Sequence, residues 1–225
     1  MAHRVYFPPL SQLGERLLID GDEAHHLLRV IRVRRGQSVE VFDGVGTCCQ
    51  ATLVEASRGL ATLERVGSLI HRPAPPPRTL LCPLPKGKRL AWLVEKLVEL
   101  GTTTLVPLLT ARSVTDPATE KGDRLRQWVI AACKQSGRDW LMTIQPPQQW
   151  AAVLESPVPP AAWMLDPGGS RLRPPIAPTT VAIGPEGGWT DDERISAERQ
   201  GWRLQSLGPS VLRVETAAMI ACSNG

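Results

Sequence analysis

I-G-P-E-G-G-W-T-D-D-E, residues 183–193, is the stretch that most strongly indicates the fold. Its order is typical of a strand that ends, a glycine-rich turn and a helix that begins. Thr190 and Glu193 have the spacing of a capping box, which satisfies free backbone donors at a helix N-terminus, and Gly201 is placed to end that helix. A strand, a turn and a helix in this order form one unit of an α/β fold.

Glycines concentrate in this turn, at Gly184, Gly187 and Gly188. Without a Cβ they let a backbone approach a bound molecule closely, although the same residues could simply form the turn. Their spacing fits neither the dinucleotide-binding G-x-G-x-x-G pattern nor the phosphate-binding G-x-x-x-x-G-K-[ST] pattern. A second loop, residues 207–213, also follows a candidate strand and precedes a helix at 214–221. Two such loops could share one pocket, which favours a binding site over two independent turns.

Strands and helices alternate from residue 79 onward. Two helices are expected from apolar residues at helical spacing, at 90–98 with Gly101 as its stop, and at 125–136 with Asp123 as its cap and Gly137 as its stop. The candidate strands are residues 79–84, 104–109, 162–166, 181–184 and 203–207. This alternation predicts a mainly parallel sheet covered by helices, with ligands bound beyond the carboxyl ends of the strands.

The earlier part of the chain has a different pattern. Short β-type runs are expected at residues 4–7, 37–42, 47–55 and 60–66, with Asp43 and Gly44 as a tight turn. One helix is expected at 23–32, with Asp22 as its cap. Prolines crowd residues 73–77 and favour an extended chain. We therefore expect a small β-barrel domain at 1–72, a proline-rich linker at 73–78 and an α/β domain at 79–225.

The composition excludes several classes of protein. With 42% hydrophobic and 21% charged residues, and no apolar run near the roughly 20 residues of a membrane span, no membrane is expected. The first residues lack the pattern of a secretory signal, so the expected compartment is the cytoplasm. Five cysteines without a C-x-x-C pair or a histidine cluster argue against a disulfide framework and structural zinc, so no metal is expected. The net charge of +4 weakly favours a polyanionic partner.

Basic side chains form two clusters that could hold phosphates. They are Arg29, Arg32, Arg34 and Arg35 in the first domain, and Lys86, Lys88 and Arg89 at the start of the second. Arginine runs are more often solvated faces than binding sites, so the clusters alone do not decide the function. His25 and His26 are expected to be structural, because adjacent residues point apart on a helix and no suitably spaced carboxylate or cysteine makes them metal ligands.

Motifs along nearly the whole chain, in consistent order, closely resemble the RsmE family of 16S ribosomal RNA uridine-N3 methyltransferases. They are H-L-L-R-V-I-R (26–32), V-F-D-G (41–44), K-G-K-R-L (86–90), V-E-K-L-V-E-L-G (94–101), A-A-C-K-Q-S-G-R (131–138), I-G-P-E-G-G (183–188) and L-G-P-S-V-L-R-V-E-T-A (207–217). Two features depart from the family. Ser210 stands where the family usually has arginine, and the sequence stops at Gly225, before the usual longer final helix, which we expect to affect dimerisation.

The resemblance implies an α/β protein with an N-terminal PUA-like β-barrel that binds RNA and a C-terminal SPOUT domain with a deep trefoil knot. The implied reaction is transfer of a methyl group from S-adenosyl-L-methionine to N3 of a specific uridine in 16S ribosomal RNA. The implied partners are the small ribosomal subunit and a second copy of the chain in a homodimer. Because N3 lies on the Watson–Crick edge, the target base must be unpaired or flipped out.

The resemblance also implies site residues. For the cofactor they are Leu165, Asp166, Ile183, Gly184, Glu186, Gly187, Gly188, Leu207, Gly208, Leu212 and Arg213. For RNA they are Arg4, Arg29, Arg32, Arg34, Lys86, Lys88 and Arg89. As catalytic residues, Glu186 and Glu215 are candidate proton acceptors, while Arg138 and Arg213 could stabilise the uridine anion. For Arg213 and Glu215, an ion pair at a helix start is an equally good interpretation.

Two other functions remain open. The chain could be a non-catalytic RNA-binding or ribosome-assembly factor that keeps the fold, although the intact glycine loops argue against this. It could also be a related knotted methyltransferase that acts on transfer RNA or on a ribose hydroxyl. Cofactor binding separates the first alternative from the main hypothesis, and the identity of the methylated nucleoside separates the second.

Overall fold

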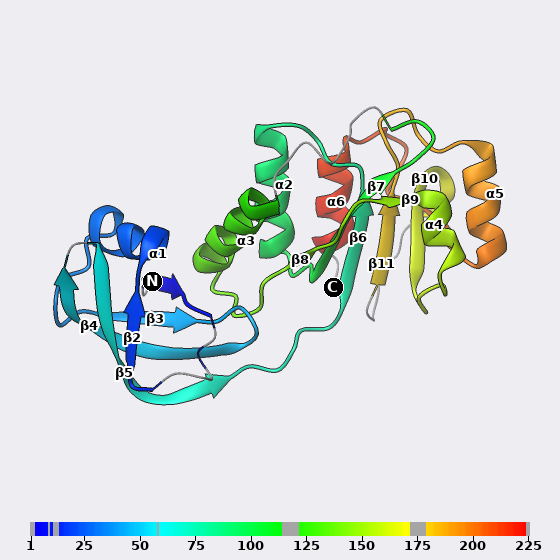
Figure 1. Ribbon diagram of the computed structural model, residues 1–225. Coiled ribbons are helices and arrows are strands. Elements are labelled where there is room, and N and C mark those ends of the chain that lie inside the picture. The colour runs from blue at the N-terminus through cyan, green and yellow to red at the C-terminus, as the bar shows by residue number, and fades with distance from the viewer. Residues whose placement is uncertain are drawn as a thin grey trace. The chain divides into compact units, whose positions relative to one another are not determined.

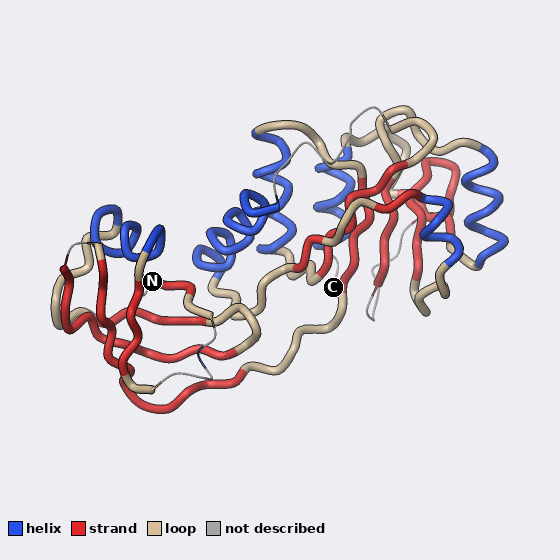
Figure 2. The backbone as a smooth tube through the Cα atoms, viewed as in Figure 1, coloured by secondary structure: helices blue, strands red, loops and turns tan. Residues whose placement is uncertain are grey.

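The computed structural model describes residues 3–8, 10, 14–57, 59–113, 122–171 and 179–223. Figures 1 and 2 trace the chain and its secondary structure. It divides into two compact units. The first comprises Met1–Ala74 together with Cys133–Leu141, and the second comprises Pro75–Ala132 and Met142–Gly225. Nothing in the sequence signalled that a segment from the middle of the chain would join the first unit.

The first unit is built on a five-stranded sheet with the order β1-β3-β4-β5-β2. β1 pairs with β3 in parallel, and the other neighbours are antiparallel. The strands are β1 (Arg4–Tyr6), β2 (Arg16–Ile19), β3 (Ser38–Phe42), β4 (Thr47–Ser57) and β5 (Leu60–His71). The residues of β2 alternate between exposed and buried, as expected when one face of a sheet covers a core. Ala24 and Leu27 close that core from the helical segment that follows β2.

The helical segment differs from the prediction. α1 (Gly21–His25) continues directly into a π-helical turn (His26–Val30), where one helix was expected. Asp20, without a side-chain hydrogen bond, occupies the N-cap position, and Asp22 lies in the first turn. The prediction of Asp22 as the cap was therefore wrong. Gly21 has a φ of 55°, a conformation that glycine adopts without steric cost.

The four strands expected in the first unit are all present, with ends shifted by a few residues, and β2 is an addition. β5 extends to His71, and residues 72–77, in neither helix nor strand, lead to the next unit's first strand.

The second unit contains a seven-stranded sheet in which every pairing is parallel. The strand order is β12-β10-β11-β6-β7-β8, and β9 also pairs with β7. The strands are β6 (Arg78–Cys82), β7 (Thr104–Leu109), β8 (Thr143–Ile144), β9 (Gln148–Gln149), β10 (Ala162–Arg171), β11 (Thr179–Ile183) and β12 (Arg203–Ser206). The predicted parallel sheet is thus confirmed, and all its carboxyl ends lie along one edge.

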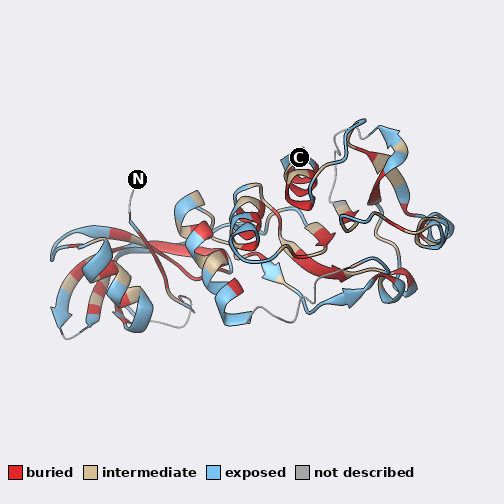
Figure 3. Cartoon of the chain, turned by 90° about the horizontal axis from the view of Figure 1, so that it is seen from above, coloured by how far each residue is buried: buried red, intermediate tan, exposed pale blue. Residues whose placement is uncertain are grey.

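Helices cover both faces of this sheet (Figure 1). α4 (Trp150–Glu155) and α5 (Asp191–Gln200) pack together over the face that carries Leu81, Met164 and Ala182. α2 (Lys88–Glu99) and α6 (Val214–Ser223) pack together, and α6 contacts β6 and β11. Figure 3 shows buried residues concentrated where these helices and strands meet. The remaining helix is α3 (Gly122–Ser136), whose last four residues are grouped with the first unit.

Most predicted elements of the second unit are present. The five predicted strands match β6, β7, β10, β11 and β12, and α5 has the predicted capping box and ends at Gly201. α3 begins at Gly122, so Asp123 lies in the first turn and is not the cap that was expected. β8, β9 and α4 were not predicted, because two to six residues are too few to establish a periodicity. All five cysteines are free and buried, and no described helix has the length and apolarity needed to cross a membrane.

Arg4 holds the segment Cys133–Leu141 within the first unit. Its guanidinium donates to Glu40 Oε1 at 2.7 Å, to the carbonyl oxygens of Cys133 and Arg138 at 2.8 and 2.9 Å, and to Asp139 Oδ1. The same group lies 4.4 Å from the centre of the Phe42 ring. Arg4 is only 7% exposed, so these contacts are largely shielded from water.

Two glycines of the turn between β3 and β4 make room for this segment. A Cβ on Gly46 would lie 2.5 Å from the Trp140 ring, and one on Gly44 would lie 2.6 Å from the Leu141 side chain. The Gly46 amide donates to Asp139 O, and the Leu141 amide donates to Gly44 O. Close backbone contact therefore accompanies the ion pairs of Arg4.

We expect Arg4→Met to lower the free energy of unfolding by about 3 kcal/mol, because it leaves the Asp139 carboxylate without its buried partner. Urea denaturation measures this. Arg72→Met is the matched control: its side chain is 60% exposed and 3.6 Å from Asp139, and it should change stability by less than about 1 kcal/mol. Equal, small effects of the two substitutions would contradict the role given to Arg4.

Candidate functional site

A cavity of about 280 Å³ lies at the carboxyl edge of the parallel sheet. Residues 165–167 of β10 and the loops that follow β11 and β12 form it, and these three are neighbouring strands in the order of the sheet. The residues that line it are Leu165, Asp166, Pro167, Ile183, Gly184, Pro185, Glu186, Gly187, Gly188, Trp189, Ser206, Leu207, Gly208, Ser210, Val211, Leu212, Val214 and Ala217. The two glycine-containing loops predicted from the sequence therefore do share one pocket.

The glycine-rich turn is shaped by Trp189. The indole Nε1 of Trp189 donates to the carbonyl oxygen of Leu165 at 2.9 Å, which ties the turn to β10. A Cβ on Gly184 would lie 2.8 Å from the same nitrogen, so only glycine fits there. Gly188 has a φ of 69° and donates its amide to Pro185 O at 2.8 Å. These two glycines are thus required by the turn itself, while they also leave backbone exposed to the cavity.

Asp166 contributes a carboxylate to the wall. It is 6% exposed, and its Oδ1 accepts the Gly168 amide at 2.8 Å. Arg194 lies 3.4 Å from the other oxygen and also pairs with Asp191. A fixed carboxylate beside apolar side chains such as Leu165 can accept hydrogen bonds from the hydroxyls of a ligand.

Three charged residues form a group beside the cavity. Arg89 Nη1 lies 3.4 Å from Glu215 Oε1 and 3.7 Å from Glu186 Oε1. Glu215 is 6% exposed and lies in the first turn of α6, where the helix dipole favours a negative charge. Its Oε1 is buried and accepts no hydrogen bond from any described residue. The Glu186 side chain, 75% exposed, lines the cavity and reaches solvent.

The structure brings most of the predicted cofactor contacts together. Each of them lines the cavity except Arg213, which is exposed at the start of α6. Of the predicted catalytic residues, Glu186 lines the cavity and Glu215 is joined to it through Arg89. Arg138 belongs to the first unit, where its carbonyl accepts from Arg4. Trp189 and Ser206 also line the cavity and were not predicted, although Trp189 lies inside the motif that was recognised.

The predicted RNA contacts fall into three situations. Arg4 has an internal role in place of the predicted contact, because its guanidinium is buried among ion pairs. Lys86, Lys88 and Arg89 are exposed around the start of α2, and Arg89 also pairs with the two glutamates. Arg29, Arg32 and Arg34 are exposed at and after the π-helical turn of the first unit.

The chain around Arg32 is conformationally unusual. Among the described residues, Arg32 is the one non-glycine residue with a positive φ, at 59°. It follows a π-helical turn, and both features are enriched at functional sites. This local geometry supports a binding role for the basic segment more than its charge alone does.

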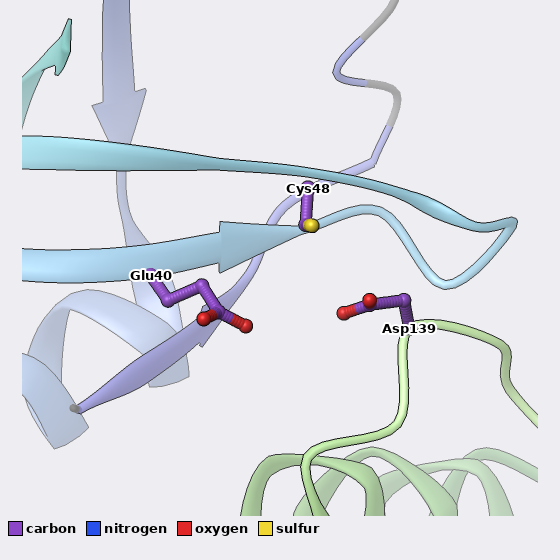
Figure 4. Close-up of side chains that lie close together, drawn as sticks. All are labelled: Glu40, Cys48 and Asp139. Atoms are coloured by element: carbon purple, nitrogen blue, oxygen red, sulfur yellow. The ribbon is translucent and has the colours of Figure 1, made fainter. Parts of the chain in front are cut away.

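Glu40, Cys48 and Asp139 lie close together in the first unit (Figure 4), with ligand atoms within 4.8 Å of one another. The donor set does not fit a metal ion. Arg4 already pairs with both carboxylates. Burial, and then the nearby Asp139 carboxylate, raise the pKa of the Cys48 thiol to about 11, so it stays protonated at neutral pH. This cluster is explained by the anchoring role of Arg4.

Comparisons with known proteins cover nearly the whole chain. Residues 72–224 match the family described as RNA methyltransferase domain, and residues 19–64 match the RNA methyltransferase PUA domain. A ribosomal RNA small subunit methyltransferase E from Synechocystis is 32% identical over 98% of this chain and 76% of its own length. A protein of the same name from Bacillus subtilis is 26% identical over 91% of this chain and 87% of its own length.

A solved structure has the same fold across both units. The ribosomal RNA small subunit methyltransferase E from Neisseria gonorrhoeae, crystallised with bound S-adenosyl methionine, matches with a TM-score of 0.88 and 28% identity. The match covers 99% of this chain and 96% of that one.

We expect Gly184→Ala to displace the Trp189 ring, because the new methyl group would lie 2.8 Å from its indole nitrogen. The substitution should lower the free energy of unfolding by about 1–3 kcal/mol and change the tryptophan fluorescence. Gly122→Ala is the matched control, since nothing lies within 4 Å of its Cβ position and it stands in the first turn of α3. A Gly184→Ala protein with unchanged stability and fluorescence would show that the turn is not packed as described.

Proposed function

The chain belongs to the ribosomal RNA small subunit methyltransferase E family, and we propose that it methylates N3 of a specific uridine in 16S ribosomal RNA with S-adenosyl-L-methionine as the methyl donor. The observation that carries this proposal is the cavity at the carboxyl edge of the parallel sheet, in a fold shared with a relative that was crystallised with this cofactor. The proposed substrate is part of the small ribosomal subunit, so we also propose a cytoplasmic location.

The lining of the cavity fits the chemistry of an adenosine moiety. Leu165, Ile183 and Leu212 supply apolar surface for a base, and the glycine-rich turn leaves backbone groups accessible for its ring nitrogens. The Asp166 carboxylate can accept hydrogen bonds from ribose hydroxyls. We propose that the residues lining the cavity, together with Arg213 at its margin, hold the cofactor. When bound, S-adenosylmethionine supplies an electrophilic methyl group on a sulfonium.

The chain's own residues must position the uridine and accept its N3 proton. We assign the proton acceptor to the pair Glu186 and Glu215, which Arg89 joins. Glu215 Oε1 accepts no hydrogen bond from the described residues, and the exposed side chain of Glu186 lies between the cavity and solvent. Arg213 is the proposed cation for the anionic base, and the role expected for Arg138 stays a prediction. The deep knot implied by the family resemblance stays a prediction.

Incubation with methyl-labelled S-adenosylmethionine and separate RNA pools tests the proposed function. Nucleoside mass spectrometry should find N3-methyluridine in small-subunit RNA. Label in transfer RNA or on a ribose would instead support the related methyltransferase. Cofactor binding without transfer to any pool would indicate a protein with no turnover on these RNAs, and the absence of cofactor binding by calorimetry would support the non-catalytic factor.

We propose that the exposed arginines of the first unit bind RNA phosphates. Arg32→Glu combined with Arg34→Glu should weaken RNA binding similarly for all sequences and flatten its salt dependence, with unchanged cofactor affinity. The control is Arg199→Glu with Arg203→Glu, which changes the net charge equally at exposed positions of the second unit. The same loss of RNA affinity in both double variants would reveal a general effect of charge and would refute a specific basic site.

We also propose a homodimer. Trp92 on α2 is 41% exposed and Ile220 on α6 is 37% exposed, and these two helices pack against each other. A stable dimer would bury about 1,200–2,000 Å², which such apolar side chains favour. Light scattering at micromolar concentration should give twice the chain mass of 24.5 kDa, and Trp92→Glu should shift the mass toward one copy. A mass of one chain for the unmodified protein would contradict the proposal.

A further inference from the structure

A short turn after β7, residues 110–113, lies against the glycine-rich turn after β11. Its residues are not among the predicted site residues and have no role in the proposed reaction. Within it, the Thr110 amide donates to Ser113 Oγ at 2.9 Å, and the Ser113 amide donates to Thr110 O at 3.1 Å. These bonds hold Ala111 and Arg112 at the tip. Both strands end at the same edge of the sheet, with β6 between them, so the turn reaches across one strand.

The tip contacts both ends of the segment that leads from the glycine-rich turn into α5. Arg112 Nη1 donates to the carbonyl oxygens of Gly187 and Trp189, at 2.9 and 3.3 Å. The Ala111 amide donates to Glu193 Oε1 at 2.9 Å, while Glu193 Oε2 accepts the Thr190 amide at 2.8 Å. This short turn therefore donates hydrogen bonds both to carbonyl groups of the glycine-rich turn and to Glu193, the capping-box glutamate of α5.

Arg112 and the cavity lie on opposite sides of the glycine-rich turn. Gly187 and Trp189 line the cavity, whereas Arg112 is not among the lining residues. The Cβ position of Gly187 lies 3.4 Å from Arg112 Cβ, so the arginine stem packs directly against the loop backbone. Arg112 is exposed, and exposed hydrogen bonds of this kind add little to overall stability. Their larger effect is to restrict the conformations of the glycine-rich turn, whose backbone is intrinsically flexible.

We propose that Arg112 is a positioning residue, which holds the turn Gly184–Trp189 in the shape that binds the cofactor. This inference rests on the proposed function, because it takes the cavity to be the S-adenosylmethionine site. Arg112 acts through the backbone of the turn and does not itself touch the cofactor. A loop that must be ordered upon binding lowers affinity, so removing Arg112 should weaken cofactor binding and leave the chemistry of the bound complex nearly unchanged.

The test compares Arg112→Ala and Arg112→Lys with Arg199→Ala, a control that removes an exposed arginine from the last turn of α5. Calorimetry should show a Kd for S-adenosylmethionine about tenfold higher in Arg112→Ala, with an unchanged melting temperature. The KM for the cofactor should rise similarly, while kcat and the KM for RNA stay near those of the unmodified protein. Arg112→Lys should be intermediate, because one ammonium can still donate to a loop carbonyl. Arg199→Ala should resemble the unmodified protein.

Other outcomes overturn the inference in distinguishable ways. If Arg112→Ala keeps its cofactor affinity and loses RNA affinity, Arg112 is an RNA contact. If both affinities are retained, its hydrogen bonds have no effect on the site. If Arg112→Ala unfolds, Arg112→Lys decides, and an unchanged Kd in that folded variant overturns the positioning role. Failure of the unmodified protein to bind the cofactor overturns the proposed function and this inference together.

Discussion

Parallel pairing of β10, β11 and β12 is the constraint on which the proposed site depends. Because all three strands run in one direction, residues 165–167 of β10 and the loops that follow β11 and β12 meet at one edge, although they are far apart along the chain. Antiparallel pairing would send alternate loops to opposite edges. The hydrogen bond from Trp189 to Leu165 then joins the turn after β11 to β10, and the cavity acquires a defined wall.

Several arginines form contacts within the protein, although the basic net charge by itself suggests only that they bind RNA. Arg4 is buried and holds a distant segment in the first unit, Arg89 joins two carboxylates beside the cavity, and Arg112 holds loop carbonyls. A planar group with several donors can bind carboxylates and backbone carbonyls at once, which an ammonium does less well. The arginines therefore fall into two classes. Some form hydrogen bonds and ion pairs within the protein, and others, such as Arg34, are exposed and are proposed to contact phosphates.

Long elements with clear periodicity were predictable, and short or irregular ones were not. The five buried apolar residues of α2 are those expected from helical spacing, and the capping box of α5 was recognised from Thr190 and Glu193. β8 and β9 have two residues each, and their strand character depends on β7 as a partner. The π-helical turn after His25 was also not predictable, because the apolar spacing of this segment does not distinguish the i→i+5 hydrogen bonds of a π-helix from those of an α-helix.

The sequence by itself determined the class of the fold, the two glycine-containing loops and, through its motifs, the family. These are local properties, since a turn, a cap or a glycine-rich loop is specified by neighbouring residues. Only the tertiary structure decided that Arg4 is internal, that residues 133–141 complete the first unit and that Arg112 donates a hydrogen bond to the glycine-rich turn. Each of these depends on residues far apart in the chain, such as Arg4 and Asp139, whose contact exists only once the backbone has folded and excluded water around them.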